Sequence, residues 1–138
     1  MNEKDLFQWL FDVYFDDLVM ARKKLSKWDC YSPKYKARIE LKCRKKHYLA
    51  GMLIQRDKWE SLTKKAAEHN DIPLYINSTP EGIFSWQLDV IDEPEWFVKK
   101  MPKTTEFRNK SFIDKEVGLL PLEQAVQIGA KQNSDGNT

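Results

Sequence analysis

The residues with the clearest chemical potential are Asp29, Glu40 and Lys42, in the first third of the chain. Two carboxylates can hold Mg²⁺, a hard cation that takes oxygen ligands. An ion held in this way polarises a phosphoryl oxygen and lowers the pKa of a bound water. Lys42 follows Glu40 by two residues, so on a strand their side chains share one face, where the lysine can orient water or stabilise developing charge. Metal-assisted hydrolysis of a phosphodiester is one reaction for which these residue types would be suited, although the Glu-x-Lys spacing by itself is a weak signal.

The segment around these residues predicts a β-strand over 35–44, in which apolar and charged side chains alternate. Alternation with a period of two over ten residues is typical of a strand with one buried and one polar face. We therefore expect Ile39, Leu41 and Cys43 to be buried, and Glu40 and Lys42 to share the opposite face. A second interpretation stays open, in which these charges are only the solvated face of an amphipathic strand.

The remaining elements follow from periodicity and from turn residues. Apolar residues at spacings of three and four predict a long helix over 4–27. Asp57, with Glu60 three residues later, predicts a capping box at the start of a helix that ends near Asn70. Strands are expected over 28–31, 52–54, 73–77, 83–91 and 110–120, with a loop over 45–51, a turn over 79–82, an irregular stretch over 94–102 and a short helix over 121–128.

Together these elements predict one α/β domain over residues 1–128, followed by a polar, disordered tail over 129–138. The order is helix, three strands, helix and further strands, which suits a central mixed sheet flanked by helices. The length of 138 residues, with 41% hydrophobic and 32% charged residues, fits one ordinary domain with a real core.

This order of elements, with Asp29 followed eleven residues later by Glu40-Leu41-Lys42, resembles the PD-(D/E)XK nuclease superfamily. The core of that superfamily is a helix, a three-stranded meander, a helix and a further strand. The resemblance covers roughly residues 3–90, and the part over 52–91 looks like small phage-encoded members. It implies that Asp29 and Glu40 are metal ligands for Mg²⁺ or Mn²⁺, with the backbone carbonyl of Leu41, and that Lys42 is the catalytic lysine.

The match departs from the family at Asp29. The family often has proline before this aspartate, whereas Trp28 stands here, and Asp29 falls on the first predicted strand where the second is usual. The superfamily sometimes draws an acid from its first helix. Asp16 and Asp17, on the predicted first helix, are therefore alternatives for the second ligand.

Basic and aromatic residues near the triplet suggest contacts with nucleic acid. A basic run directly follows the triplet and suits phosphates, an aromatic residue next to it suits base stacking, and cations at a helix N-terminus also meet phosphate. The alternative for each is an ordinary polar loop or helix surface. The residues concerned are Arg44, Lys45, Lys46, Tyr48, Arg56 and Lys58.

Other classes of function lack their sequence signals. No apolar run approaches the ~20 residues needed to span a bilayer, and the N-terminus lacks the pattern of a signal peptide, so we expect a cytoplasmic protein that acts without a membrane. Cys30 and Cys43 are expected as two buried thiols. There is no glycine-rich phosphate loop, which argues against an NTPase and a nucleotide cofactor.

The sequence therefore predicts a metal-dependent endonuclease of DNA, encoded by a phage or a mobile element. We expect a homodimer, because two copies let so small a chain reach both strands. One alternative is a catalytically inactive module of the same fold that binds nucleic acid or a protein partner. Another is a small inhibitor of a host enzyme.

Overall fold

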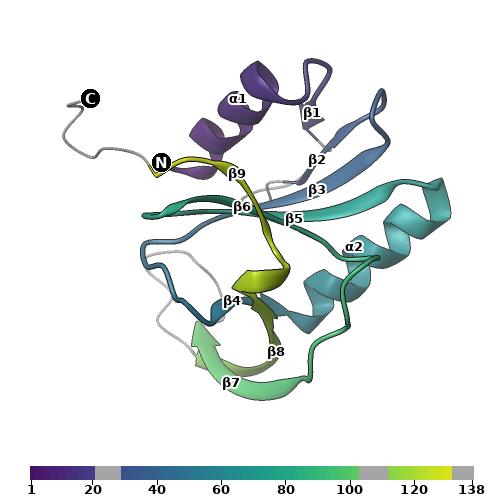
Figure 1. The fold of residues 1–138 in the computed structure, drawn as a ribbon. Coiled ribbons are helices and arrows are strands. Elements are labelled where there is room, and N and C mark those ends of the chain that lie inside the picture. Colours follow the sequence, from purple (N-terminus) through teal and green to yellow (C-terminus); the bar gives the residue numbers. More distant parts are fainter. Residues whose placement is uncertain (21–28, 103–111, 132–138) are drawn as a thin grey trace.

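A computed structural model describes residues 1–20, 29–102 and 112–131, and these form three layers. The helix α1 (Glu3–Val13) covers one face of a six-stranded sheet. The helix α2 (Arg56–His69) and a second, three-stranded sheet lie on the other face (Figure 1). The chain thus has an α/β fold with a central mixed sheet between helices, as the sequence predicts.

The central sheet has the order β1-β2-β3-β5-β6-β9. Neighbouring strands are antiparallel except β3 and β5, which are parallel. A parallel pair needs a crossover connection, and the segment between these two strands contains α2. The strands are β1 (Val19–Met20), β2 (Asp29–Ser32), β3 (Ala37–Cys43), β5 (Ile72–Thr79), β6 (Gly82–Gln87) and β9 (Val126–Gly129).

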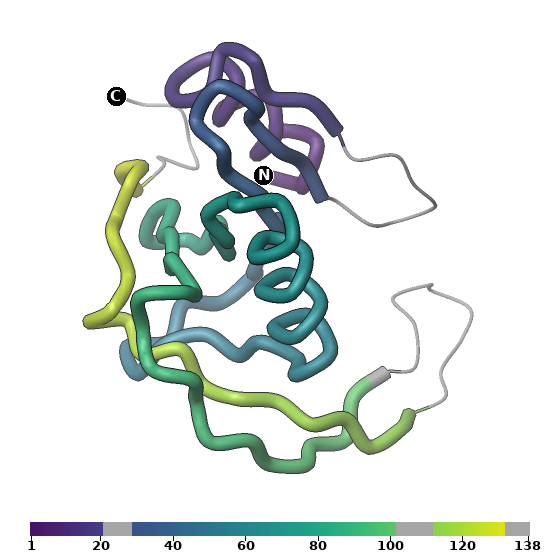
Figure 2. The backbone as a smooth tube through the Cα atoms, turned by 90° about the vertical axis from the view of Figure 1, so that its right-hand side faces the viewer, coloured from purple at the N-terminus to yellow at the C-terminus, as the bar shows by residue number. Residues whose placement is uncertain are grey.

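The second sheet has the order β4-β8-β7 and is antiparallel throughout. Its strands are β4 (Gly51–Gln55), β7 (Phe97–Pro102) and β8 (Phe112–Pro121). Figure 2 shows β7 and β8 running side by side along the foot of the molecule. After β8, a short 3₁₀ turn (Leu122–Gln124) leads the chain back to β9 in the central sheet, so β8 and β9 connect the two sheets.

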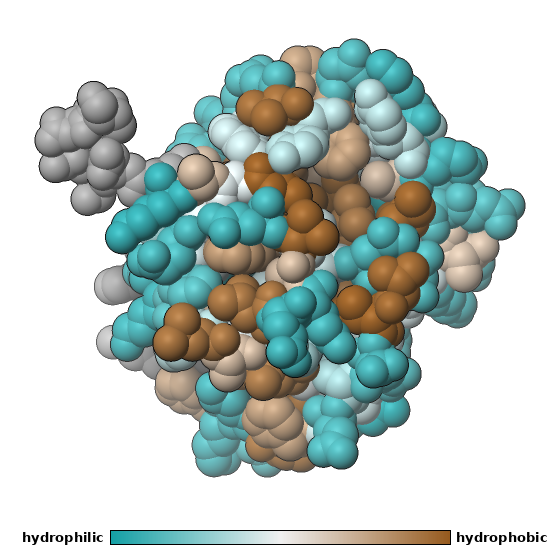
Figure 3. Space-filling model, in the orientation of Figure 1, coloured by the Kyte–Doolittle hydropathy of each residue, from teal (hydrophilic) through white to brown (hydrophobic). Residues whose placement is uncertain are grey.

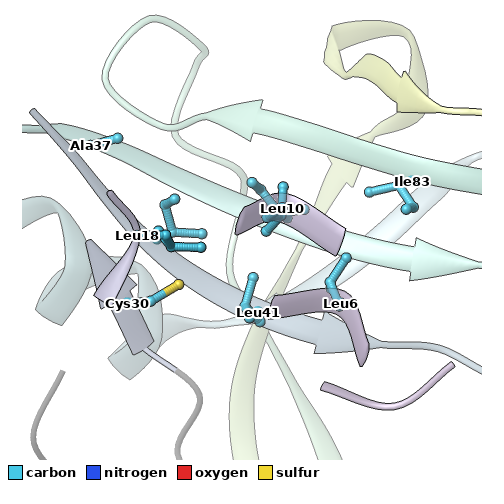
Figure 4. Close-up of a cluster of buried hydrophobic side chains, with 9 residues drawn as sticks. Leu6, Leu10, Leu18, Cys30, Ala37, Leu41 and Ile83 are labelled. Atoms are coloured by element: carbon cyan, nitrogen blue, oxygen red, sulfur yellow. The ribbon is translucent and has the colours of Figure 1, made fainter. Parts of the chain in front are cut away.

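One hydrophobic core fills the space between α1 and the central sheet. Leu6 and Leu10 of α1 are fully buried and gather with Leu41 of β3 and Ile83 of β6 (Figure 4). A reciprocal pair of hydrogen bonds between Asn2 and Asp5 caps the start of α1. Each leucine buried in this way stabilises the fold by about 1.5–3 kcal/mol relative to leaving it exposed.

A second core lies on the opposite face, where α2 and the second sheet meet β5 and β6. Trp86 is fully buried there, and its indole Nε1 donates a hydrogen bond of 2.9 Å to the Pro121 carbonyl at the end of β8. Gly51, at the start of β4, has φ of 138°, and a Cβ there would collide with the Leu120 carbonyl. Glycine at this position therefore lets β4 and β8 pair closely. Outside these cores, hydrophobic and hydrophilic residues are intermixed on the face seen in Figure 3.

The strand predicted over 35–44 is confirmed as β3. Ile39 and Leu41 are 1% and 2% exposed, and Cys43 is partly buried. Glu40 and Lys42 share the face that points away from this core. The strands predicted over 52–54 and 73–77 are confirmed as β4 and β5, and the strand predicted over 110–120 is confirmed as β8 from residue 112, where the description of the chain resumes. Asn70 ends α2 in a left-handed conformation.

The predicted N-terminal helix over 4–27 is wrong beyond Val13. The amides of Tyr14 and Phe15 both donate to the Leu10 carbonyl, which closes the helix, and Val19 and Met20 then pair with β2. Pairing with a distant strand overrides the local helical period here. Residues 21–28, where the rest of this prediction and Trp28 fall, lie outside the described residues. Among the residues that the structure describes, Asp29 consequently lies on the second strand.

Five smaller predictions are also wrong. Helix α2 begins at Arg56 after Gln55, which makes no side-chain cap, so Asp57 is not the N-cap. The stretch over 94–102 contains β7, the strand expected over 83–91 ends at Gln87, and 121–128 holds a 3₁₀ turn and part of β9. The predicted tail begins too early, because β9 extends to Gly129; residues 132–138 lie outside the described residues.

We expect Leu41→Ala to lower the free energy of unfolding by about 2–5 kcal/mol, because it leaves a cavity beneath α1. Urea unfolding followed by circular dichroism measures the change. The control is Leu49→Ala, since Leu49 is 87% exposed and its loss should change stability by no more than about 0.5 kcal/mol. Equal effects of the two substitutions would contradict the proposed position of the core.

Candidate active site

Two carboxylates meet on adjacent strands of the central sheet. Asp29, the first residue of β2, lies directly opposite Glu40 of β3 in the antiparallel register. Side chains paired in this way have Cβ atoms about 4.5–5.5 Å apart. Asp29 is partly buried, and its Oδ1 is fully buried without a hydrogen-bond partner among the described residues. An unpaired buried carboxylate oxygen beside a second carboxylate is suited to bind a cation or a proton donor.

Two lysines lie beside this pair. Lys42 is two residues after Glu40 on the same face of β3. Lys58, from the first turn of α2, brings its Nζ to 3.9 Å from Glu40 Oε2, and the Glu40 side chain is only 16% exposed. The site therefore places two acids and two cations in a partly dehydrated region, where charge interactions are stronger than in water.

Burial decides the protonation of the central carboxyl. Burial raises the pKa of Glu40 to about 8 and neighbouring Asp29 adds to the rise, whereas Lys58 and Lys42 oppose it. Burial also lowers the pKa of Lys42, and nearby Arg44 lowers it further. Glu40 is thus held partly neutral near neutral pH, and an additional cation next to it would favour its ionised form.

A cavity of about 490 Å³ opens beside Glu40 and Lys42, between the charged face of β3 and the second sheet. Lys58 and Arg44 also line it, as does Lys99 of β7. A smaller cavity of about 80 Å³ reaches Asp29 on the other side of Glu40 and Lys58. Glu40 and Lys58 therefore form the wall shared by the two cavities.

Arg44, predicted to bind phosphate, is mainly an internal crosslink. It donates hydrogen bonds to Asn77 Oδ1 at 2.9 Å and to the Tyr75 hydroxyl at 3.0 Å, and a further one to the Leu53 carbonyl of β4. These bonds join β5 of the central sheet to the second sheet. None of them uses Nη1, and the side chain still lines the large cavity.

The other predicted nucleic-acid contacts divide into two groups. Lys45 and Lys46 are exposed on the loop after β3, and Tyr48 in the same loop is 56% exposed and lines the large cavity. Arg56 instead pairs with Glu60 and Glu116 and lines a different hollow. The structure therefore brings Lys58 and Tyr48 to the candidate site and leaves Arg56 away from it.

Asp16 and Asp17, the alternative ligands, have structural roles at the turn between β2 and β3. Asp17 accepts hydrogen bonds from the Ser32 hydroxyl at 2.5 Å and the Lys34 amide at 2.7 Å, and the first of these lowers its pKa. Asp16 pairs with the Lys34 ammonium at 3.4 Å. Both lie at the end of the hairpin opposite Asp29, and neither belongs to α1.

Sequence reasoning missed Glu3 and Lys99. Glu3, in the first turn of α1, accepts a hydrogen bond of 3.0 Å from the Cys43 amide and raises the pKa of Lys42. Lys99 comes from β7, in a segment predicted to be irregular. Only the basic run around 99–103 hinted at Lys99, and no local pattern pointed to Glu3.

A divalent cation fits the donor set at Asp29 and Glu40. Within residues 1–20, 29–102 and 112–131 there is no group of three or more histidine, cysteine, aspartate or glutamate side chains that could hold a metal. Mg²⁺, however, commonly keeps several waters and binds through one or two carboxylates. The buried Asp29 Oδ1 beside Glu40 can accept either such a cation or the proton of a neutral Glu40. The ligand role of the Leu41 carbonyl stays a prediction.

Comparisons with known proteins found no matching family model, no matching curated protein and no matching solved structure. In the part of the chain that the structure describes, no helix has the length and apolar character needed to cross a membrane.

The raised pKa of Glu40 predicts a pH effect on stability in the absence of metal. Stability associated with protonated Glu40 is complete below its ordinary pKa of 4.5 and is lost as the pH rises through about 8. Glu40→Gln should therefore become progressively more stable than the wild type over this range, by at most about 1.4 kcal/mol per pH unit.

Urea unfolding in EDTA at a series of pH values measures the difference. Glu68→Gln, on the exposed surface of α2, is the matched control and should show a difference that does not change with pH. If the free energies of unfolding of the wild type and Glu40→Gln change with pH in parallel, the pKa of Glu40 is not raised and the prediction is contradicted.

Proposed function

We propose that this protein is a Mg²⁺- or Mn²⁺-dependent endonuclease of DNA with a PD-(D/E)XK-like core. The observation that carries the proposal is the cross-strand pair of Asp29 and Glu40, with Lys42 two residues later. Glu40 and Lys42 line the large cavity with its basic residues, and Asp29 lines the smaller cavity next to it. A strand whose charged face is only solvated would require neither the pairing of two carboxylates across strands nor a lysine on the same face.

The topology supports the same proposal. Helix α1, the antiparallel strands β1, β2 and β3, helix α2, and β5 parallel to β3 follow the order of a helix, a meander, a helix and a further strand. Asp29 on the second strand and Glu40-Leu41-Lys42 on the third correspond to the usual positions of the motif. The inserted strand β4, which joins a separate sheet, is an addition to that order.

In this mechanism the chain's own residues have distinct tasks. Asp29 and Glu40 would hold the divalent ion, which when bound would supply charge neutralisation at the phosphate and a more acidic water. Lys42 lies next to Glu40 and donates hydrogen bonds to the attacked phosphate or its water, where it stabilises developing negative charge.

The positive residues around the cavity supply the attraction for substrate. Lys58 and Lys99 line its walls, and Lys45 and Lys46 lie exposed on the loop beside Tyr48. A polyanionic backbone gains affinity from each such contact through the release of counterions. In the proposal, the chain acts as a homodimer, so that one assembly offers two such sites to a DNA substrate.

A specific observation favours a second candidate function. The Lys58 ammonium lies 3.9 Å from Glu40 and provides the carboxyl with a counter-charge of its own. If Lys58 substitutes for a metal ion, the chain is a catalytically inactive module that binds nucleic acid or a protein partner through the same cavity. Metal-dependent cleavage separates the two candidates.

Purified protein with Mg²⁺ or Mn²⁺ should cut DNA, and EDTA should stop the reaction. Glu40→Ala should abolish both metal binding and cleavage, because it removes one of two carboxylate ligands. Lys42→Ala should keep the metal and lose about 10²–10³-fold in turnover, as removal of an electrostatic stabiliser typically does. Gel assays of cleavage and calorimetry with Mn²⁺ give these measurements.

Lys64→Ala, on the exposed surface of α2, is the control for Lys42→Ala and should cleave like the wild type. Intact duplex, single-stranded and branched DNA with either metal would exclude the enzyme and favour the binding module. Cleavage that survives Glu40→Ala would show that the active site lies elsewhere or that a contaminating nuclease is present.

The loop lysines generate a separate prediction. Replacing Lys45 and Lys46 together with alanine should weaken DNA binding alike for all sequences, and should reduce the slope of log affinity against log salt by roughly two units. Fluorescence anisotropy over a salt series measures this slope. The pair Lys4→Ala and Lys64→Ala removes the same charge from other exposed positions, and an equal effect of that pair would assign the loop lysines to general surface charge.

A further inference from the structure

The two walls of the large cavity have opposite chemical character. Glu40, Lys42 and Lys58 line the side formed by β3 and α2. The second sheet supplies mainly apolar side chains on the facing side, among them Met101 of β7 and Leu119 of β8, with Lys99 of β7 as the one cation that the described residues add there. A ligand that fills this cavity must therefore have a charged side and an apolar side.

Tyr48 adds an aromatic surface to the same cavity. It lies in the loop between β3 and β4, is 56% exposed, and lines the cavity. Among the described residues, its ring makes no aromatic pair. An exposed tyrosine next to cations is a typical stacking surface for a nucleic-acid base.

An intact double helix does not match these walls. Its outer surface offers phosphates and sugars, and its bases are stacked inside, so an apolar wall next to the reaction centre would have no partner. An unpaired nucleotide, in contrast, combines an anionic phosphate with a flat apolar base. Its phosphate suits the side with Lys42 and Lys58, and its base suits the side with Tyr48 and Leu119.

The size and depth of the site lead to the same conclusion. A volume of about 490 Å³ falls within the range of pockets that enclose a small molecule, about 300–1,000 Å³. A duplex is too large to enter a cavity of this size, since its major groove alone is about 12 Å wide. The Glu40 side chain is 16% exposed, so the phosphate to be cut has to enter between the two sheets.

We propose that this site acts on unpaired nucleotides of DNA, as found in a single strand, a flap or a frayed end, with the base held between Tyr48 and the apolar wall of the second sheet. This inference rests on the proposed nuclease function for the phosphate side of the site. The contacts with the base are independent of catalysis.

Binding without cleavage tests the inference. Fluorescence anisotropy in EDTA compares labelled oligonucleotides with the same number of phosphates: a single strand, a blunt duplex, a duplex with a flap, and a single strand of abasic residues. The single strand and the flap should bind at least about tenfold more tightly than the blunt duplex, because they add base stacking to the electrostatic attraction. The abasic strand should lose this advantage.

Tyr48→Ala should weaken binding of the single strand by about 5- to 100-fold and leave the duplex unchanged, whereas Tyr48→Phe should bind like the wild type. Tyr35→Ala is the matched control, because Tyr35 is similarly exposed but lies in the turn between β2 and β3. Leu119→Glu, which adds a negative charge to the apolar wall, should also weaken single-strand binding. Circular dichroism verifies that each variant is folded.

Equal affinity for the blunt duplex and the single strand, or no effect of Tyr48→Ala, would overturn the inference. Cleavage of blunt duplex as fast as single strand with Mn²⁺ would overturn it and leave the proposed nuclease intact. Selective binding of single strands without cleavage under any metal would support the inference on the ligand and remove the proposed catalytic function.

Discussion

The constraint on which this structure depends is that its central strand β3 is hydrogen-bonded on both sides while one of its faces is charged. Strands β2 and β5 pair with it, and α1 covers its apolar face. The charged face cannot turn to open solvent, because α2 and the second sheet lie over it. Glu40 and Lys42 are therefore held in a partly dehydrated layer, where each charge must find a partner or change its protonation.

The chain meets this requirement differently at successive positions along β3. Arg38, near the start, pairs with Asp71 at 2.8 Å. Arg44, after the end, is stabilised by hydrogen bonds to Asn77, Tyr75 and the carbonyl of Leu53. Both arrangements satisfy a partly buried guanidinium and hold neighbouring elements together. The two ends of the charged face thus serve the fold.

The middle of the strand remains incompletely compensated. Asp29 adds a second carboxyl next to Glu40, one of its oxygens has no hydrogen-bond partner among the described residues, and the pKa of Glu40 rises to about 8. Such a cluster costs stability, and proteins commonly tolerate that cost where a site binds or reacts. The adjoining cavity and its lysines make the same position the best candidate for chemistry.

The sequence by itself determined the parts that rest on local patterns. Alternation over 35–44 predicted β3, with Leu41 buried and with Glu40 and Lys42 on one face, because side chains of a strand alternate regardless of its partners. Likewise, apolar spacing and Asn70 predicted the body and the end of α2. The two short edge strands β1 and β9 and the strand β7 were missed, since pairing with distant segments creates them.

Only the tertiary structure decided which residues share the site. The register of β2 against β3 places Asp29 opposite Glu40, and one step of register would move Asp29 to the other face. The crossover through α2 brings Lys58 to Glu40, and the second sheet brings Lys99 and the apolar wall into the cavity. The tertiary structure also keeps Arg56 away from the site, because Arg56 pairs with Glu116. These placements depend on contacts between residues far apart in the chain, which no local periodicity encodes.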